Sequence, residues 1–181
     1  HDLEDKVVGI VGMGRIGQRV AARLKPFDVH TYYFDYRRLS TAEEQLLGAR
    51  YMTLGAIVPH CDVVSINIPL TPQTDGLFNH DLLCSMKKGA YLVNTARGRI
   101  VDTDALVGVL ENGHLAGYAG DVWYPQPAPP DHPWRKMPNH AMTPHVSGTS
   151  LEAQKRYSDG IRDCLTCFLE GNSLERDFLI V

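Results

Sequence analysis

The sequence lacks a long apolar run. No stretch approaches the roughly 18 uninterrupted apolar residues that a membrane span requires. Positive charge is not in excess either, because the 181 residues carry a formal net charge of -3 at pH 7. Nothing therefore draws the chain to phosphate backbones or anionic lipids, and we expect neither nucleic acid nor a membrane as a partner.

Cysteine is scarce, with four residues in the whole chain. Such a number excludes a scaffold stapled by disulfides and favours a reducing compartment, so we expect a cytoplasmic protein. Residues 1–5 are polar and acidic, which argues against a signal peptide. The chain opens on His instead of Met and closes on an apolar run. We interpret it as a piece of a longer polypeptide.

The sequence does contain an alternation of short β-branched runs and segments with helical spacing. This order predicts an α/β fold, a doubly wound parallel sheet covered by helices on both faces. The length fits one domain with an appendage. The predicted strands are 7–11, 30–34, 62–66, 90–94, 115–119 and 140–142. The predicted helices are 15–25, 42–47, 81–86, 103–110 and 151–169.

One segment breaks the alternation. Six prolines fall between Pro125 and Pro138, and proline excludes both a helix interior and a central strand. We expect residues 124–138 to form an extended surface loop. A long loop in a compact domain more often has a function than not.

A glycine-rich turn follows the first predicted strand. Gly12, Gly14 and Gly17 form G-x-G-x-x-G, and the turn opens a predicted helix. In this context the first glycine allows the tight turn, the second lets a pyrophosphate approach the backbone, and the third lets helix and strand pack closely. The motif therefore predicts a Rossmann-type dinucleotide site. The alternative is a glycine turn that only packs.

An acidic residue ends the second predicted strand, where such sites need one. Asp35 can accept hydrogen bonds from both ribose hydroxyls of an adenosine, and its charge would repel a 2′-phosphate. We therefore expect NAD as the cofactor in preference to NADP. Arg37 and Arg38 lie close by in the sequence and weaken this preference. The alternative is that Asp35 is a solvated loop acid.

Two charged or titratable side chains follow later strands, at the edge where ligands of α/β sheets bind. Arg97 can clamp a carboxylate with two parallel hydrogen bonds. His145 can donate, accept or carry a proton. The alternatives are a surface arginine and a structural histidine. We interpret the remaining internal histidines as surface or packing residues: His30, His60, His80, His114, His132 and His140. Cys164 and Cys167 lie in a helical pattern without a second ligand pair, so we expect no metal site.

Four segments together resemble a known family. They are 94–98, 116–129, 131–135 and 143–150. The chain is similar to the D-2-hydroxyacid dehydrogenase superfamily over nearly its whole length. Within this superfamily, it looks most like the NAD-dependent, metal-free formate dehydrogenases. Gln126 is the specific element, because ordinary hydroxyacid dehydrogenases carry a glutamate in that role.

The resemblance implies oxidation of formate to carbon dioxide by direct hydride transfer to NAD. Arg97 would bind the substrate carboxylate, His145 would donate a hydrogen bond to it, and Gln126 would hold His145. Formate has no hydroxyl, so the reaction needs no general base. A neutral His–Gln pair therefore suits formate better than a hydroxy acid.

The resemblance also implies which residues contact the coenzyme. Besides the three glycines and Asp35 they are Arg15, Ile16, Pro69, Leu70, Thr71, Pro72, Gln73, Thr95, Asp121, His145, Ser147 and Gly148. Residues 1–148 would form the NAD-binding domain. Residues 149–181 would be a helical return segment that rejoins a catalytic domain, whose other part, including an asparagine of the formate site, lies outside this chain.

The resemblance also implies that the intact protein is a homodimer. Without the missing part of the catalytic domain, the fragment alone is expected to be inactive. Three alternatives stay open: an isolated NAD-binding module, a related hydroxyacid dehydrogenase with a different substrate, and a non-catalytic NADH-sensing relative.

Overall fold

The computed structural model describes residues 2–174. The chain divides into two compact units, His1–Pro144 and His145–Val181. We therefore describe each unit by itself. Residues 175–181 of the predicted return segment lie outside the described residues. The boundary after residue 148 and the role of the segment beyond it stay predictions about the intact polypeptide.

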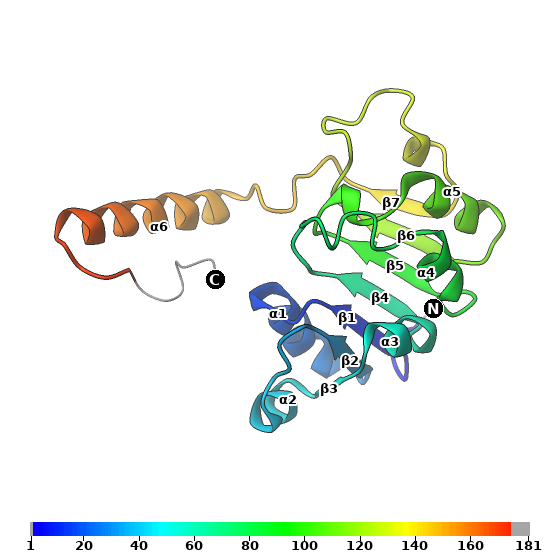
Figure 1. The fold of residues 1–181 in the computed structure, drawn as a ribbon, viewed down its shortest axis with the longest axis horizontal. Coiled ribbons are helices and arrows are strands. Elements are labelled where there is room, and N and C mark those ends of the chain that lie inside the picture. Colours follow the sequence, from blue (N-terminus) through cyan, green and yellow to red (C-terminus); the bar gives the residue numbers. More distant parts are fainter. Residues whose placement is uncertain (1, 175–181) are drawn as a thin grey trace. The chain divides into compact units, whose positions relative to one another are not determined.

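The first unit is built on a seven-stranded parallel sheet in the order β3-β2-β1-β4-β5-β6-β7 (Figure 1). Val11, the last residue of β1, pairs with Phe34 of β2 and Ile66 of β4. Neighbouring strands thus end at the same edge. The strands are β1 Val7–Val11, β2 His30–Phe34, β3 Ala49–Tyr51, β4 Val63–Ile66, β5 Tyr91–Asn94, β6 Gly117–Gly120 and β7 His140–Met142.

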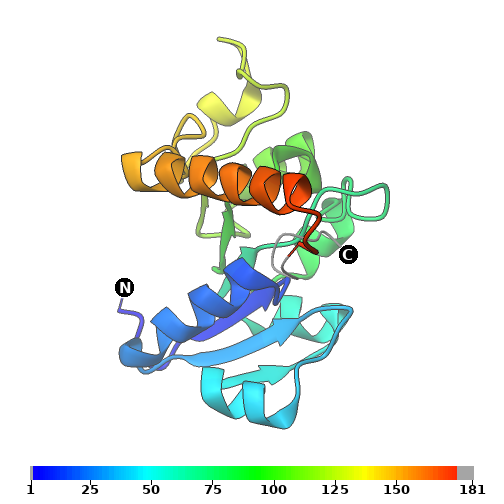
Figure 2. The same ribbon diagram turned by 90° about the vertical axis from the view of Figure 1, so that its left-hand side faces the viewer.

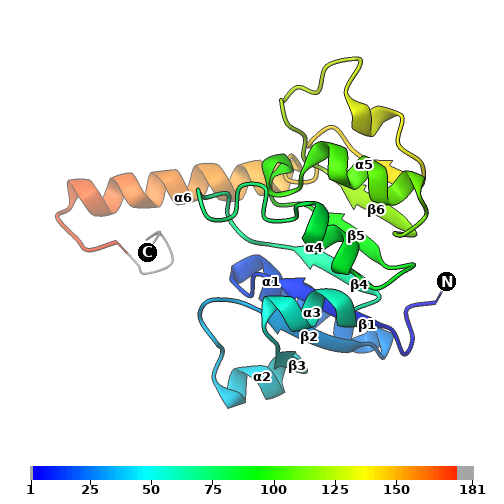
Figure 3. The same ribbon diagram turned by 45° about the vertical axis from the view of Figure 1, so that its right-hand side comes forward.

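Helices cover the sheet from both sides. In Figure 3, α3, α4 and α5 lie side by side over one face, and α3 contacts both β1 and β2. The first helix, α1, packs on β1 and α2 from the other side, which Figure 2 brings forward. The helices are α1 Arg15–Leu24, α2 Thr41–Leu47, α3 Leu54–His60, α4 His80–Ser85 and α5 Thr103–Glu111.

The hydrophobic core has one cluster on each face. Successive residues of a strand point to opposite faces, and Ile10 and Val11 show this at the centre of the sheet. Ile10 packs with Ala21 of α1, whereas Val11 packs with the cluster that includes Ile57 of α3. All four side chains are fully buried. Burial on both faces explains why β1 is a short apolar run without alternation.

The sequence predicted the fold class correctly, and every predicted strand and helix is present with small shifts at the ends. Two elements were missed, β3 and α3. β3 has three residues, too few for a recognisable pattern, and α3 contains Pro59, a residue that ordinarily breaks a helix. Residues 124–138 contain no strand and no α-helix, only the short 3-10 helix Pro133–Arg135.

The second unit contains one helix, α6 (Leu151–Leu169), in its described part. The Ser150 side chain caps it by accepting a hydrogen bond from the Ala153 amide. Asp159 pairs with Lys155 and Arg162 along the helix, and the Lys155 hydrogen bond lowers the pKa of the Asp159 carboxyl. Across the described residues of both units, no helix combines the length and apolarity needed to cross a membrane.

Candidate functional site: a dinucleotide groove

A cavity of about 430 Å3 opens at the carboxyl ends of β1, β2 and β4. The strand order reverses between β1 and β4, and open α/β sheets bind ligands at such a switch point. The cavity lies within the size range of small-molecule sites. Its lining residues are Gly12, Gly14, Phe34, Asp35, Tyr36, Asn67, Ile68, Pro69, Thr71, Gln73, Thr74 and Leu77.

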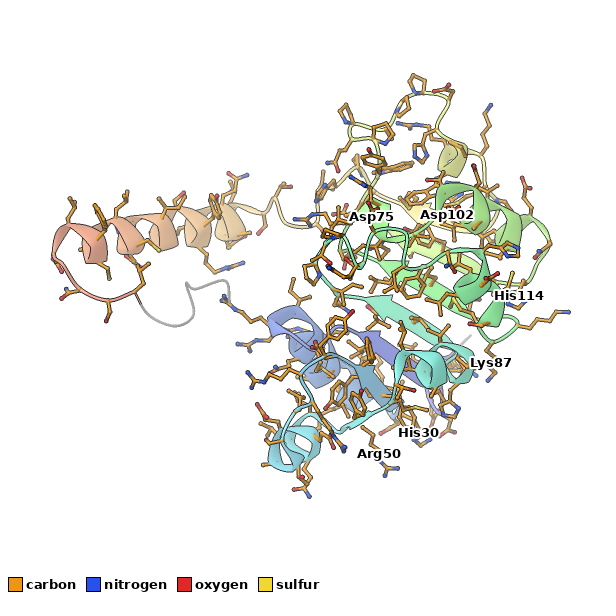
Figure 4. The ribbon with its side chains drawn as sticks, in the orientation of Figure 1. His30, Arg50, Asp75, Lys87, Asp102 and His114 are labelled. Carbon is orange, nitrogen blue, oxygen red and sulfur yellow. The ribbon has the colours of Figure 1, made fainter. Side chains whose placement is uncertain are left out.

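The opposite edge of the sheet carries other charged and titratable groups. Figure 4 shows the labelled His30, Lys87 and His114 there, whereas Asp75 lies toward the carboxyl ends of the strands. His30 starts β2, and Lys87 forms an ion pair with Asp62, just before β4. Their placement away from the groove agrees with the interpretation of His30 and His114 as surface or packing residues.

The three motif glycines are needed for different reasons. A side chain on Gly17 would place its Cβ 2.0 Å from the Gly12 carbonyl oxygen, and one on Gly12 would meet the Asn67 carbonyl at 2.6 Å. Gly12 also has a φ of 100°, which favours glycine. A Cβ on Gly14 would meet no atom of the described residues within 4 Å. The protein's own packing therefore requires Gly12 and Gly17, while Gly14 leaves open space at the start of α1 that fits an approaching pyrophosphate.

Asp35 is held in place at the end of β2 by two backbone amides. Met13 N donates to Oδ2 at 2.6 Å, and Arg37 N donates to Oδ1 at 3.1 Å. A carboxylate has about four acceptor positions, so two remain for other donors. The groove thus has an anchored anion beside the glycine turn, as an adenosine ribose requires.

The two arginines after Asp35 differ in their surroundings. The Arg38 guanidinium pairs with Glu44 at 3.1 Å and lies over the Tyr51 ring, 5.3 Å from its centroid. Hydrogen bonds from Arg38 and Tyr33 lower the pKa of the Glu44 carboxyl. The negative charge of Glu44 holds the Arg38 guanidinium in the ion pair. Of the pair, Arg37 is therefore the better candidate for contact with a phosphate in the groove.

Farther along the same edge, a buried asparagine shapes the turn that carries Arg97. The Asn94 amide donates to the Arg97 carbonyl at 2.9 Å, and its oxygen accepts from Ala96 N at 3.0 Å. Gly98 packs so tightly that a Cβ would lie 2.5 Å from the Trp123 carbonyl carbon. The Arg97 side chain is exposed and donates to the Ala96 carbonyl at 2.7 Å. A rigid turn thus presents a guanidinium at the ligand-binding edge.

The ends of β6 and β7 supply a second polar position. The Asp121 side chain is 3% exposed and accepts a hydrogen bond from the Thr143 hydroxyl. Thr143 N in turn donates to the Gly120 carbonyl at 3.0 Å. Asp121 is therefore fixed in direction, which suits a group that orients a ligand.

Gln126 lies beside a cavity of about 380 Å3 formed by the proline-rich loop and the end of β7. The residues around this cavity are Trp123, Gln126, Pro127, Ala128, Arg135, Met142, Thr143 and Pro144. The Arg135 guanidinium lies over the Trp123 ring, 5.3 Å from its centroid.

The groove brings together Gly12, Gly14, Asp35 and, from the predicted segment 69–73, Pro69, Thr71 and Gln73. Leu70 and Pro72 are not among its lining residues. Arg15 and Ile16 open α1 directly after Gly14, and Thr95 follows β5. His145, Ser147 and Gly148 belong to the second unit. Their contacts with a coenzyme therefore stay predictions.

Sequence reasoning missed several wall residues of the groove. Phe34 and Tyr36 flank Asp35, and their place at a strand end could have indicated them. Thr74 gave no signal, because its role depends on the folded turn. Its hydroxyl donates to the Pro69 carbonyl at 2.7 Å and accepts from Thr71 N at 2.8 Å, which fixes this wall. Among the residues that the structure describes, no three His, Cys, Asp or Glu side chains gather to hold a metal ion.

Comparisons with known proteins agree with this geometry. The chain is 53% identical over 182 aligned residues to formate dehydrogenase from Pseudomonas sp. (strain 101), covering 100% of the chain and 45% of that protein. It is 50% identical to the mitochondrial formate dehydrogenase of Hordeum vulgare, covering 100% of the chain and 48% of that protein. The structure of NAD-dependent formate dehydrogenase from Staphylococcus aureus in complex with NAD matches with a TM-score of 0.87 and 50% identity, covering 100% of the chain and 54% of that one.

The chain thus spans about half the length of the curated relatives it matches. The family model for the NAD binding domain of D-isomer specific 2-hydroxyacid dehydrogenases matches residues 1–147. This match covers the glycine turn, Asp35 and the strand ends that form the groove. The chain belongs to the family of D-isomer specific 2-hydroxyacid dehydrogenase NAD-binding domains.

Proposed function

We propose that the polypeptide containing this chain oxidises formate to carbon dioxide with NAD, and that this chain is its coenzyme-binding half. The observation that carries the proposal is that Arg97 and Gln126 both lie in segments that follow neighbouring strands of the sheet. Asn94 of β5 pairs with Gly120 of β6, and Arg97 and Gln126 follow these strands. Arg97 can bind a carboxylate, and Gln126 provides a neutral amide. An enzyme that needs a general base would have a carboxylic acid in place of Gln126. The high identity to formate dehydrogenases supports the same substrate.

The groove holds the adenosine and pyrophosphate part of NAD in this proposal. Gly14 leaves room for the pyrophosphate at the start of α1, and Asp35 offers two acceptors to the adenosine ribose. The charge of Asp35 disfavours a 2′-phosphate, which selects NAD over NADP. Thr95 and Asp121 follow β5 and β6, toward the half of the groove where the nicotinamide would lie. When bound, the coenzyme supplies a carbon that accepts a hydride.

The reaction requires positioning more than proton transfer. The C–H bond of formate breaks, its electron pair leaves with the hydrogen as hydride, and the remaining atoms are carbon dioxide. No hydroxyl proton is released, so no side chain has to act as a base. Arg97 binds the carboxylate, His145 donates a hydrogen bond to it, and Gln126 orients the imidazole without adding a charge. Fixed charges and orientation then supply most of the rate.

The remaining proposals concern the intact protein. We propose a homodimer, as the resemblance implies. A cytoplasmic location also stays a proposal, since one relative at 50% identity is named as a mitochondrial enzyme.

A deuterium-labelling experiment tests the proposed substrate. The intact polypeptide is incubated with NAD and deuterated formate, and the coenzyme product is analysed by mass spectrometry. We expect reduced coenzyme that is one mass unit heavier than with ordinary formate, and a slower rate because the C–D bond breaks. D-Lactate and D-glycerate serve as competing substrates. Turnover of either of them without turnover of formate would assign the chain to a hydroxyacid dehydrogenase.

A binding experiment separates the enzyme from a simple binding module. The groove lies wholly within His1–Pro144, so the 181-residue chain is expected to bind NADH by itself. The isolated chain should show NADH fluorescence enhancement without formate turnover. If the intact polypeptide also binds NADH without turnover of any tested substrate, it is a coenzyme-binding module and not a dehydrogenase.

A further inference from the structure

The proline-rich loop must hold Gln126 without help from regular secondary structure. Residues 124–138 form neither strand nor α-helix, and Gln126 itself is exposed. Prolines stiffen the backbone but remove amide donors. Side chains that bind the loop's carbonyl groups therefore contribute to the position of Gln126.

One buried histidine forms two hydrogen bonds with the loop backbone, and one of them is to a carbonyl group. His132 is 3% exposed, and its Nε2 lies 2.9 Å from the Tyr124 carbonyl oxygen. Its Nδ1 lies 3.2 Å from the Trp134 backbone nitrogen. A carbonyl oxygen can only accept and a backbone amide can only donate. Nε2 must therefore carry the proton and Nδ1 must be bare, which defines a neutral imidazole in one tautomer.

Aromatic packing fixes the orientation of this ring. The His132 ring lies edge to face against Trp123 and Trp134, with centroid distances of 5.3 Å to each. Trp134 is 1% exposed, and its Nε1 donates to the Thr103 carbonyl at 3.2 Å. The histidine thus joins the loop to the core beneath it.

An arginine binds the loop on the other side of Gln126. Arg135 Nε donates to the Pro129 carbonyl at 2.8 Å, and Nη2 donates to the Ala128 carbonyl at 2.9 Å. The carbonyl that His132 binds lies two residues before Gln126, and the carbonyls that Arg135 binds lie two and three residues after it. Gln126 is therefore flanked by fixed points in both directions along the chain.

We infer that His132 is a positioning residue for Gln126, acting as a neutral imidazole that ties the start of the loop to its end. The inference rests on the proposed function, because Gln126 matters only if it orients a group at the substrate. His132 is buried and is not among the residues that line either cavity. It acts through the backbone on which Gln126 is carried, and a small displacement of such a group is costly in rate.

A double-mutant cycle in the intact polypeptide tests this coupling. His132→Phe keeps the ring packing and removes both hydrogen bonds. We expect it to lower kcat/KM for formate about 10- to 100-fold while the Kd for NADH stays within about twofold, because the groove lies on other strands. His132→Asn can still accept from Trp134 N and should lose less. His80→Phe, the same change on an exposed histidine of α4, is the matched control and should leave both values unchanged.

The second arm of the cycle introduces Gln126→Ala. Once Gln126 is gone its position no longer matters, so adding His132→Phe should lower kcat/KM by less than about threefold more. The inference is overturned if His132→Phe lowers kcat/KM as much in the Gln126→Ala background as in the wild type. It is also overturned if NADH affinity falls as much as kcat/KM, because His132 would then be a general structural residue. If His132→Phe does not fold, His132→Asn completes the same cycle with the same criteria.

A spectroscopic measurement tests the inference independently of the identity of the substrate. Nitrogen-15 NMR of the 181-residue chain at neutral pH should show His132 protonated at Nε2 and bare at Nδ1. The opposite tautomer, or a charged ring, would overturn the inference whatever the enzyme oxidises. If the proposed function is wrong, the wild-type polypeptide does not oxidise formate. If only the inference is wrong, the wild type oxidises formate, but the losses in kcat/KM from His132→Phe and Gln126→Ala are additive.

Discussion

The glycine turn and the proline-rich loop both place functional atoms at the edge of one sheet, but they do so by opposite means. The turn at Gly12–Gly17 is held by close backbone contact between β1, α1 and β4. The loop at 124–138 is held by the side chains of His132, Trp134 and Arg135, which bind carbonyl groups. Backbone contact leaves no room for a side chain at Gly12 or Gly17. The order of the loop depends instead on keeping the side chains that bind its carbonyl groups.

The comparison explains why one region was easier to predict. The glycine motif is contiguous in sequence, and its chemistry follows from residue type and spacing. The loop's order depends on pairs such as Trp134 and Thr103 that lie far apart in the chain. Only the folded structure brings these groups together.

The largest effect is expected at Arg97, which lies between the two regions. Arg97→Ala should lower formate turnover at least about 100-fold, because it removes the charge that meets the carboxylate. NADH affinity should change little, since the groove does not include Arg97. Initial rates and NADH fluorescence titration measure the two effects. Arg97→Lys restores a charge without the planar fork and should recover only part of the rate. An equal loss of NADH binding would make Arg97 structural.

A matched pair of glycine variants comes next and separates packing from ligand approach. Gly17→Ala would force a Cβ to 2.0 Å from the Gly12 carbonyl oxygen, so it should destabilise the fold by about 1–3 kcal/mol or more. Gly14→Ala meets open space in the protein and should leave the Tm unchanged while weakening NADH binding about tenfold, through a clash with the pyrophosphate alone. Thermal unfolding measures the Tm of each variant, and fluorescence titration measures its affinity for NADH. If the Gly14→Ala variant binds NADH with normal affinity, the prediction that the pyrophosphate binds beside Gly14 is wrong.

The third expected effect is a change in coenzyme preference at Asp35. Asp35→Ser removes the repulsion of a 2′-phosphate and the charge-assisted ribose bonds, so NAD affinity should fall about 10-fold or more while NADP affinity rises. Arg37 should become the phosphate partner, because Arg38 is already paired with Glu44. Asp35→Asn keeps an acceptor without the charge and should lose less NAD affinity. Kinetics with both coenzymes measure the ratio. An unchanged preference for NAD would contradict the role of Asp35.

The smallest effect is expected at the edge of the sheet away from the groove. Lys87 pairs with Asp62 at 2.6 Å, and this hydrogen bond, helped by the Val7 amide, lowers the pKa of the Asp62 carboxyl. Lys87→Met should reduce the free energy of unfolding by less than about 1 kcal/mol, because the pair is partly exposed. NADH binding should not change.

The sign of the pH dependence at Asp62 follows from the lowered pKa. A carboxyl that is more acidic in the folded state stabilises it above the unfolded value of about 3.9. This stability is lost as the pH falls through the folded pKa. The difference between wild type and Lys87→Met, measured by denaturant unfolding, should therefore shrink in strong acid. Lys88→Met, on the neighbouring exposed lysine, should show no such dependence. A difference that is constant with pH would show that the ion pair contributes nothing.

The sequence by itself determined the parallel sheet, the glycine turn and the strand ends that carry Asp35, Arg97 and Asp121. These features depend on local patterns: apolar runs buried on both faces, glycine where backbone approaches backbone, and polar residues where strands end. The short strand β3 and the helix α3 with its internal Pro59 were not predicted, because packing against β1 and β2 overrides their weak local preference.

Only the tertiary structure decided how the walls of the site are held. It distinguished the glycines that the fold needs from Gly14, which leaves space for a ligand. It showed that Arg38 is paired with Glu44. It also showed that His132, expected to be a surface or packing residue, is a buried ring with a hydrogen-bond partner at each nitrogen. The physical reason is the same in each case: a side chain's role depends on which donors and acceptors surround it, and those come from strands and loops distant in the sequence.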